Sequence, residues 1–117
     1  MIHKKTVMAA LSIDGLFDAA IRIQVNERSI SLTFSENSVR IKFPTTRRLA
    51  EFLNVPHYYI LPYFAMMEEE ELITRAERVG ILTTAKGSQK MLALMQQNYA
   101  GEMQEILGPE IFSVLTR

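Results

Sequence analysis

The fold of this chain is decided by residues 44–87, which read PTTRRLAEFLNVPHYYILPYFAMMEEEELITRAERVGILTTAKG. Pro44 is followed by Thr45 and Thr46, and a threonine hydroxyl placed here accepts a hydrogen bond from the free amides that open a helix. Apolar side chains then recur at helical spacing, at Leu49, Ala50 and Leu53. The stretch therefore predicts a helix just after Pro44 and a tight turn at residues 54–56.

A second helix is predicted directly after that turn, because proline is favoured at the first position of a helix and Pro56 stands there. Its buried stripe, at steps of four and three, is Ile60, Phe64 and Met67. Pro62 lies past the first turn, where it removes the hydrogen bond to the carbonyl of Tyr58 at a cost of about 3 kcal/mol. Two interpretations are open: the helix is kinked at Pro62, or residues 56–61 form a separate turn and the helix starts at Pro62.

The rest of the stretch predicts a hairpin and a further helix. Residues 72–83 are expected as two strands joined by a loop at residues 76–80. From Thr84 the pattern is helical as far as the stop at Gly108-Pro109, and residues 110–115 are expected as a last short helix. The apolar stripe of the long C-terminal helix consists of Met91, Leu92, Met95, Tyr99, Met103, Ile106 and Leu107.

Upstream of the stretch, apolar and polar residues alternate in three segments, at residues 21–25, 30–34 and 39–43. Alternation with a period of two indicates half-buried strands, and the polar linkers between the segments have hairpin length. We therefore expect an antiparallel three-stranded meander. Before it, residues 4–17 carry apolar side chains that could line one side of a short helix: Val7, Met8, Leu11, Leu16 and Phe17.

Two short segments resemble a known family. Residues 49–55, LAEFLNV, resemble the Leu-Ala-x-x-Leu-x-Val segment of winged helix-turn-helix regulators of prokaryotes, and residues 83–87, TTAKG, resemble the family's Leu-Thr-x-x-Gly. The resemblance covers roughly residues 44–94. It implies a winged helix-turn-helix there. Together with the N-terminal three-stranded antiparallel meander and the long C-terminal helix predicted from the apolar periodicity, we expect an α+β fold.

We expect one compact unit with three parts. Residues 1–43 would be an N-terminal extension with a helix and the meander, residues 44–94 the winged helix-turn-helix, and residues 95–117 a helical dimerisation segment. Many regulators of this class pair through terminal helices, and a two-fold dimer matches two half-sites on DNA. We therefore expect a homodimer. The alternative is that the long C-terminal helix folds back onto the meander.

In this family the second helix of the pair enters the major groove, while the start of the first helix and the wing contact phosphates. The residues that the resemblance places at the DNA are Thr45, Thr46, Arg47, Arg48, His57, Tyr58, Tyr59, Tyr63, Arg75, Arg78 and Lys86. The alternative for the charged members is that they are ordinary solvated side chains. The leading hypothesis is a DNA-binding transcriptional regulator whose partners are double-stranded DNA and a second copy of the chain.

The predicted reading helix departs from the family pattern. Its exposed positions include Leu61 and Pro62, which cannot read a hydrogen-bond code, and its tyrosines are typical of protein interfaces. The alternative function is therefore a winged-helix module that binds a protein partner through the surface of residues 57–63, within a larger regulatory or replication complex. The four glutamates at residues 68–71 are either a solvated helix end or an acidic patch, and Glu71 stands where the family often has glycine.

The predicted meander offers another cationic surface. Its polar face would be basic and rich in hydroxyl groups, and would consist of Arg22, Gln24, Ser31, Thr33, Arg40 and Lys42. Two interpretations are open: this face contacts phosphates, or it is simply the solvent-exposed side of a sheet.

Composition limits the other possibilities. The 13 basic and 13 acidic residues cancel, so DNA binding requires segregated charge. The chain has no cysteine, which excludes disulfides and fits a reducing compartment, and no apolar run approaches the roughly 18 residues of a membrane span. We therefore expect a cytoplasmic protein with no membrane contact.

Nothing in the sequence favours an enzyme. The two histidines, His3 and His57, have no carboxylates at metal-binding spacing, and there is no glycine-rich phosphate loop. Asp14 and Asp18 lie one helical turn apart, a spacing that is common by chance. We expect no catalytic residues, no metal and no cofactor.

Overall fold

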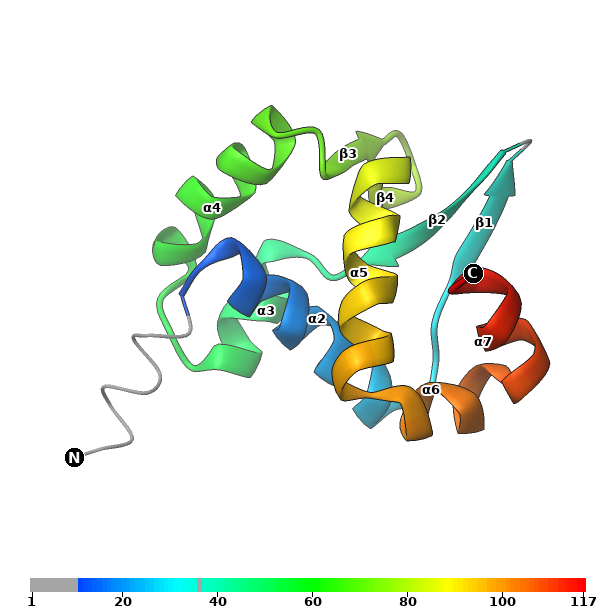
Figure 1. The fold of residues 1–117 in the computed structure, drawn as a ribbon. Coiled ribbons are helices and arrows are strands. Elements are labelled where there is room, and N and C mark those ends of the chain that lie inside the picture. Colours follow the sequence, from blue (N-terminus) through cyan, green and yellow to red (C-terminus); the bar gives the residue numbers. More distant parts are fainter. Residues whose placement is uncertain (1–10, 36) are drawn as a thin grey trace.

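The computed structural model describes residues 11–35 and 37–117, and this part of the chain forms six helices and a four-stranded antiparallel sheet (Figure 1). Helix α2 (Ile13–Glu27) opens it. The side chain of Ser12 caps this helix, accepting a hydrogen bond from the amide of Gly15 at 2.9 Å. Of the short helix expected at residues 4–17, residues 4–10 lie outside the described residues.

The prediction of a strand at residues 21–25 is wrong, because these residues belong to the second half of helix α2. Their alternation misled because both Ile21 and Ile23 are buried, although they lie about 200° apart around a helix. The helix contacts α3 on one side and α5 and α6 on the other, so its apolar side chains do not follow a single stripe. The three-stranded meander is therefore a two-stranded hairpin, formed by β1 (Leu32–Ser35) and β2 (Ser38–Phe43).

The β1–β2 hairpin and the hairpin expected at residues 72–83 share one sheet, in the order β1-β2-β4-β3. Strands β3 (Ile73–Ala76) and β4 (Gly80–Thr83) form the second hairpin, close to the bounds that the sequence predicted. Strand β2 pairs with β4 through Lys42 opposite Leu82 and Phe43 opposite Ile81. Ile41 and Phe43 of β2 are buried in the same core as the helices that follow the strand.

The pair of helices predicted from residues 44–69 is confirmed. Helix α3 (Thr46–Leu53) is capped by Thr45 and ends at Asn54, which adopts a left-handed conformation with φ +57°. Helix α4 (His57–Glu69) runs through Pro62, so the interpretation that it begins at Pro62 is wrong. Pro56 precedes its first residue as the N-cap. Proline lacks an amide hydrogen, so the Tyr58 carbonyl has no helical donor.

The long C-terminal helix expected from Thr84 to the stop at Gly108-Pro109 is divided into two, α5 (Ala85–Asn98) and α6 (Ala100–Leu107), and α7 (Pro109–Leu115) follows the stop. The break falls at Tyr99, whose φ of −138° leaves the helical region, and not at Gly101. Because of the turn, Met95 of α5 and Met103 of α6 both reach full burial in the same core. The stop at Gly108-Pro109 and the last short helix are confirmed.

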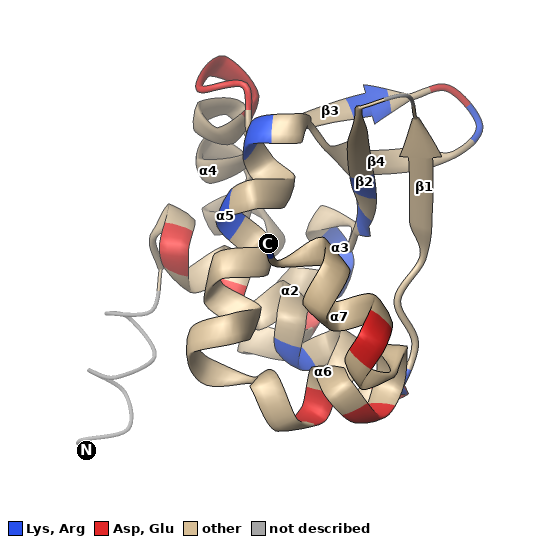
Figure 2. Ribbon diagram, turned by 45° about the vertical axis from the view of Figure 1, so that its right-hand side comes forward, with Lys and Arg blue, Asp and Glu red and all other residues tan. Residues whose placement is uncertain are grey.

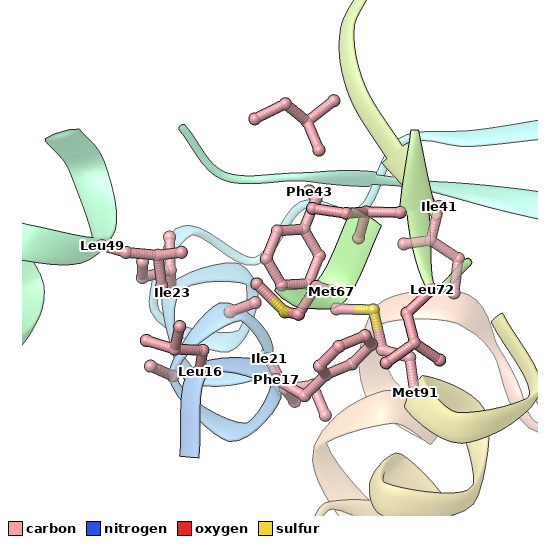
Figure 3. Close-up of a cluster of buried hydrophobic side chains, with 14 of the residues drawn as sticks. Leu16, Phe17, Ile21, Ile23, Ile41, Phe43, Leu49, Met67, Leu72 and Met91 are labelled. Carbon is pink, nitrogen blue, oxygen red and sulfur yellow. The ribbon is translucent and has the colours of Figure 1, made fainter. Parts of the chain in front are cut away.

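The core lies between the sheet and the helices, and every described segment contributes to it (Figure 3). The predicted stripe of Leu49, Ile60, Phe64 and Met67 shares this interior, with each side chain at most 1 % exposed. Phe43 is at its centre, with edge-to-face ring contacts at centroid distances of 5.1 Å to Phe17 and 5.9 Å to Phe64. In the described residues, no helix has the length and apolar character needed to cross a bilayer.

Candidate nucleic-acid interface

The N-terminus of α3 presents two arginines. The hydroxyl oxygen of Thr45 accepts a hydrogen bond from the amide of Arg48 at 3.1 Å, which leaves earlier amides of the helix available to an anion. Both arginine side chains are exposed, but they differ in their partners. Arg48 is bound to the carboxylate of Glu27 at the end of α2, whereas Arg47 forms no ion pair with residues 11–35 or 37–117.

A side-chain hydrogen bond ties the starts of α3 and α4 together. The Oγ1 atom of Thr46 lies 2.6 Å from Nε2 of His57, and both residues are half-buried. This contact fixes the first turn of α4 against α3, so His57 positions the helix. Thr46 and His57 are thus partly occupied in holding the helix pair, and each retains only its remaining surface for a ligand.

The exposed face of α4 is aromatic and apolar. Tyr58 is 65 % exposed, and its ring meets that of Tyr59 edge-to-face at a centroid distance of 4.8 Å. Leu61 and Met66 are also exposed, at 44 % and 43 %. Tyr63 is different, since it is half-buried and packs against the core. The described side chains of this face offer two exposed phenol hydroxyls to a partner, and otherwise apolar surface.

The acidic residues at the end of α4 contact side chains of the segments that follow, β3 and α5. Glu71 adopts a left-handed conformation with φ +61°, the conformation expected where the family often has glycine. The backbone carbonyl of Glu70 accepts a hydrogen bond from the ammonium group of Lys86 at 2.9 Å. Glu68 pairs with Arg75 of β3. Figure 2 shows the acidic turn above α4 close to the basic start of α5.

The β3–β4 hairpin carries the cations that the sequence predicted at a wing, Arg75 and Arg78. Arg75 lies on β3, and its Nε atom is 3.3 Å from a carboxylate oxygen of Glu68. Arg78 stands in the turn with φ +67° and is exposed, with no ion pair in the described part of the chain. Of the predicted cations, Arg47 and Arg78 are therefore available to phosphates, while Arg48 and Arg75 already hold carboxylates.

The basic sheet face that was expected is only partly present. Arg22 and Gln24 belong to α2: the Arg22 guanidinium lies 5.3 Å from the centroid of the Phe52 ring, and the Gln24 amide donates to the carbonyl of Lys42 at 3.1 Å. Arg40 and Lys42 do lie on the outer face of β2, because Ile41 and Phe43 point to the core.

The two aspartates one helical turn apart are occupied in structural contacts. Asp14 forms an ion pair with Lys90 at 2.5 Å, and Asp18 accepts a hydrogen bond from the Tyr99 hydroxyl. Burial and this hydrogen bond raise the pKa of Tyr99 to about 12. Among the described residues, no group of three His, Asp or Glu side chains could hold a metal ion.

The hollows of the described surface are shallow. A cleft of about 360 Å³ is lined by residues at the end of α2 and the start of α3, including Gln24, Glu27 and Arg48. Buried Oε1 of Gln24 has no hydrogen-bond partner among the described residues. A second hollow of about 470 Å³ follows the turn between α3 and α4 and includes Arg47 and His57.

Sequence reasoning missed the contacts that restrain the predicted arginines. Glu27 and Arg48 are 21 residues apart, and the alternation that suggested a strand placed the end of α2 elsewhere. Glu27 and Arg48 come together only because α2 continues to Glu27 and ends beside the start of α3. The pairing of Glu68 with Arg75 is more local, and a helix followed by a hairpin that returns past its end could have suggested it.

Comparisons of the chain with protein-family models, with curated proteins and with solved structures gave no match, so its chemistry rests on the residues described above.

Proposed function

We propose that this chain is a transcriptional regulator that binds double-stranded DNA as a homodimer, through a winged helix-turn-helix at residues 44–94. Its support is the order of elements: α3 and α4 meet through the left-handed turn at Asn54, and the β3–β4 hairpin and α5 follow. In this arrangement α4 is the helix offered to the major groove, and the β3–β4 turn is the wing.

One observation carries the proposal. Helix α3 and the wing each present a cation, Arg47 and Arg78, that is exposed without an ion pair in the described part of the chain. An arginine that contacts a phosphate releases a counterion, so its contribution depends steeply on salt. Tyr58 and Tyr59 add hydroxyl groups that bind phosphate oxygens or base edges.

The first test is a titration of labelled genomic fragments, measured by fluorescence anisotropy over a series of salt concentrations. Each of the variants Arg47→Gln and Arg78→Gln should lower the slope of log affinity against log salt by about 0.9, alike for all sequences. Arg28→Gln removes the same charge from a side chain that pairs with Glu105 of α6 and should leave the slope unchanged. Absent binding, or binding that does not vary with salt, would reject the proposal.

The homodimer part of the proposal rests on a different surface from the one that the sequence suggested. The Met91–Leu107 stripe is used within one chain, since Met91, Met95 and Met103 are fully buried. The apolar surface left at the C-terminal end lies between β1 and α7, where Phe34, Ile111 and Val114 line a hollow and are 67 %, 51 % and 57 % exposed. We place the contact between copies on this patch.

A second candidate function is recognition of a protein through α4. The observation that favours it is the apolar exposed face, formed by Tyr58, Tyr59, Leu61 and Met66, beside two arginines already paired with carboxylates. Leu61→Ser removes apolar surface and leaves the tyrosine hydroxyls in place. It should weaken a protein contact strongly while changing DNA affinity little, whereas Tyr58→Phe should do the reverse.

A further inference from the structure

The outer face of the β1–β2 hairpin has an unusual composition. Side chains alternate between the two faces of a strand, and the buried Ile41 and Phe43 define the inner face. The outward positions of the two strands are then fixed by the register, in which Thr33 stands opposite Arg40 and Ser35 opposite Ser38. All outward residues of the hairpin strands are hydroxyl-bearing or cationic: Thr33, Ser35, Ser38, Arg40 and Lys42.

This face carries positive charge without compensating acids. The four strands contain no aspartate or glutamate, and the outward residues include two basic ones, Arg40 and Lys42. The third base of the sheet, Arg75, stands opposite Ile81 on the other face and pairs with Glu68. Arg40 and Lys42 form no ion pair within residues 11–35 and 37–117. An ordinary solvated sheet face mixes both signs of charge, so this segregation in a chain of zero net charge points to an anionic partner.

The face is continuous with the proposed wing. Lys42 stands opposite Leu82 of β4, and its Cε atom would lie 3.8 Å from a Cβ atom built at Gly80. Gly80 directly follows the wing turn that holds Arg78. Thr74 of β3 is the other neighbour of Leu82 and adds a hydroxyl group to the same face. Lys42, the buried apolar Leu82 and Thr74 thus form one row across β2, β4 and β3, and the cations of this face, Arg40 and Lys42, both belong to β2, next to the start of the wing turn's return strand.

We infer that this outer sheet face, defined by Thr33, Arg40, Lys42 and Thr74, is a second contact surface for the phosphate backbone of duplex DNA. The inference rests on the proposed function, because it takes the DNA at the wing as its starting point. Arginine, lysine, serine and threonine side chains supply most side-chain contacts to phosphate oxygens. None of these contacts reads a base, so the face lengthens the bound segment and adds affinity without adding sequence preference.

The test compares two random-sequence duplexes, one of about 12 base pairs, roughly one helical turn, and one about twice as long. The full chain and the double variant Arg40→Gln/Lys42→Gln are titrated with each by anisotropy over a salt series. For the long duplex, the double variant should lower the salt slope by about 1.8, which corresponds to two lost phosphate contacts, and should weaken binding at least several-fold. The short duplex should show little change.

The control variant Arg28→Gln/Lys90→Gln removes the same number of charges from side chains that pair with Glu105 and Asp14, outside the outer sheet face, and should leave both duplexes unaffected. If the double variant binds the long duplex with an unchanged slope while Arg47→Gln still lowers it, the sheet face has no role and the proposed function stands. If the unaltered chain binds neither duplex, the proposed function fails as well. Equal loss on both duplexes would also overturn the inference, because it would reflect total charge and not an added contact.

Discussion

The hydroxyl group of Tyr99 donates a hydrogen bond of 2.6 Å to Oδ1 of Asp18, across 81 residues of chain. The contact joins the break between α5 and α6 to the first half of α2. It sets the position at which the C-terminal segment turns, so that α6 contacts α2 again.

This hydrogen bond predicts an alkaline transition. The pKa of Tyr99 is raised from 10.0 to about 12, first by burial and then by the Asp18 bond. The folded state therefore holds the phenol proton more tightly than the unfolded state, and the stabilisation is complete below pH 10 and is lost as the pH rises toward 12. Urea unfolding of the chain and of Tyr99→Phe should show a difference in unfolding free energy that is constant up to about pH 9 and shrinks above it. A constant difference up to pH 12 would contradict the assignment.

A second prediction concerns two glycines in the C-terminal helices. A Cβ atom at Gly87 would lie 1.9 Å from the carbonyl oxygen of Leu72, a backbone atom that cannot move aside. Gly87→Ala should therefore destabilise the fold by about 3 kcal/mol, near the upper end of the range for point substitutions. At Gly101 a Cβ atom meets nothing within 4 Å. Gly101→Ala should stabilise α6 by up to about 1 kcal/mol. Thermal and urea unfolding measure both, and similar effects of the two changes would be inconsistent with the packing.

The ion pair between Arg48 and Glu27 leads to a third prediction. If α3 presents its N-terminus to phosphates, the Glu27 carboxylate both restrains Arg48 and repels the DNA. Glu27→Gln should then raise affinity for duplex DNA several-fold and steepen its salt dependence by about 0.9, one additional phosphate contact. Glu105→Gln is the matched control, since it changes the net charge equally but releases Arg28 and leaves the pair of Glu27 and Arg48 intact. An equal gain from both variants would show that only net charge matters.

The apolar patch between β1 and α7 gives a fourth prediction, on assembly. Val114→Glu places a carboxylate in the middle of the patch, where pairing of two copies would bury it without a partner, so it should convert the proposed dimer into a monomer. Ser113→Glu adds the same charge at the neighbouring exposed position and should leave the dimer intact. Sedimentation velocity of the three proteins measures this. A chain that is already monomeric without substitution would remove the homodimer from the proposed function.

Local patterns were sufficient for the part of the fold around α3 and α4. The threonine cap, the period of Leu49, Ile60, Phe64 and Met67, and the hairpin signals at residues 72–83 predicted elements that the structure confirms. Each of these segments buries one face in the core, so the period of its buried apolar residues reports its backbone conformation. The β1–β2 hairpin was predictable for the same reason.

Tertiary structure alone decided the rest. Residues 21–25 alternate like a strand but form a helix, because α2 has neighbours on more than one side and both Ile21 and Ile23 can be buried there. The stripe from Met91 to Leu107 suits one long helix, yet the Tyr99–Asp18 contact and the burial of Met103 favour a turn. The candidate site follows the same division: its arginines are evident in the sequence, but which of them are held by carboxylates depends on residues that only the folded chain brings together.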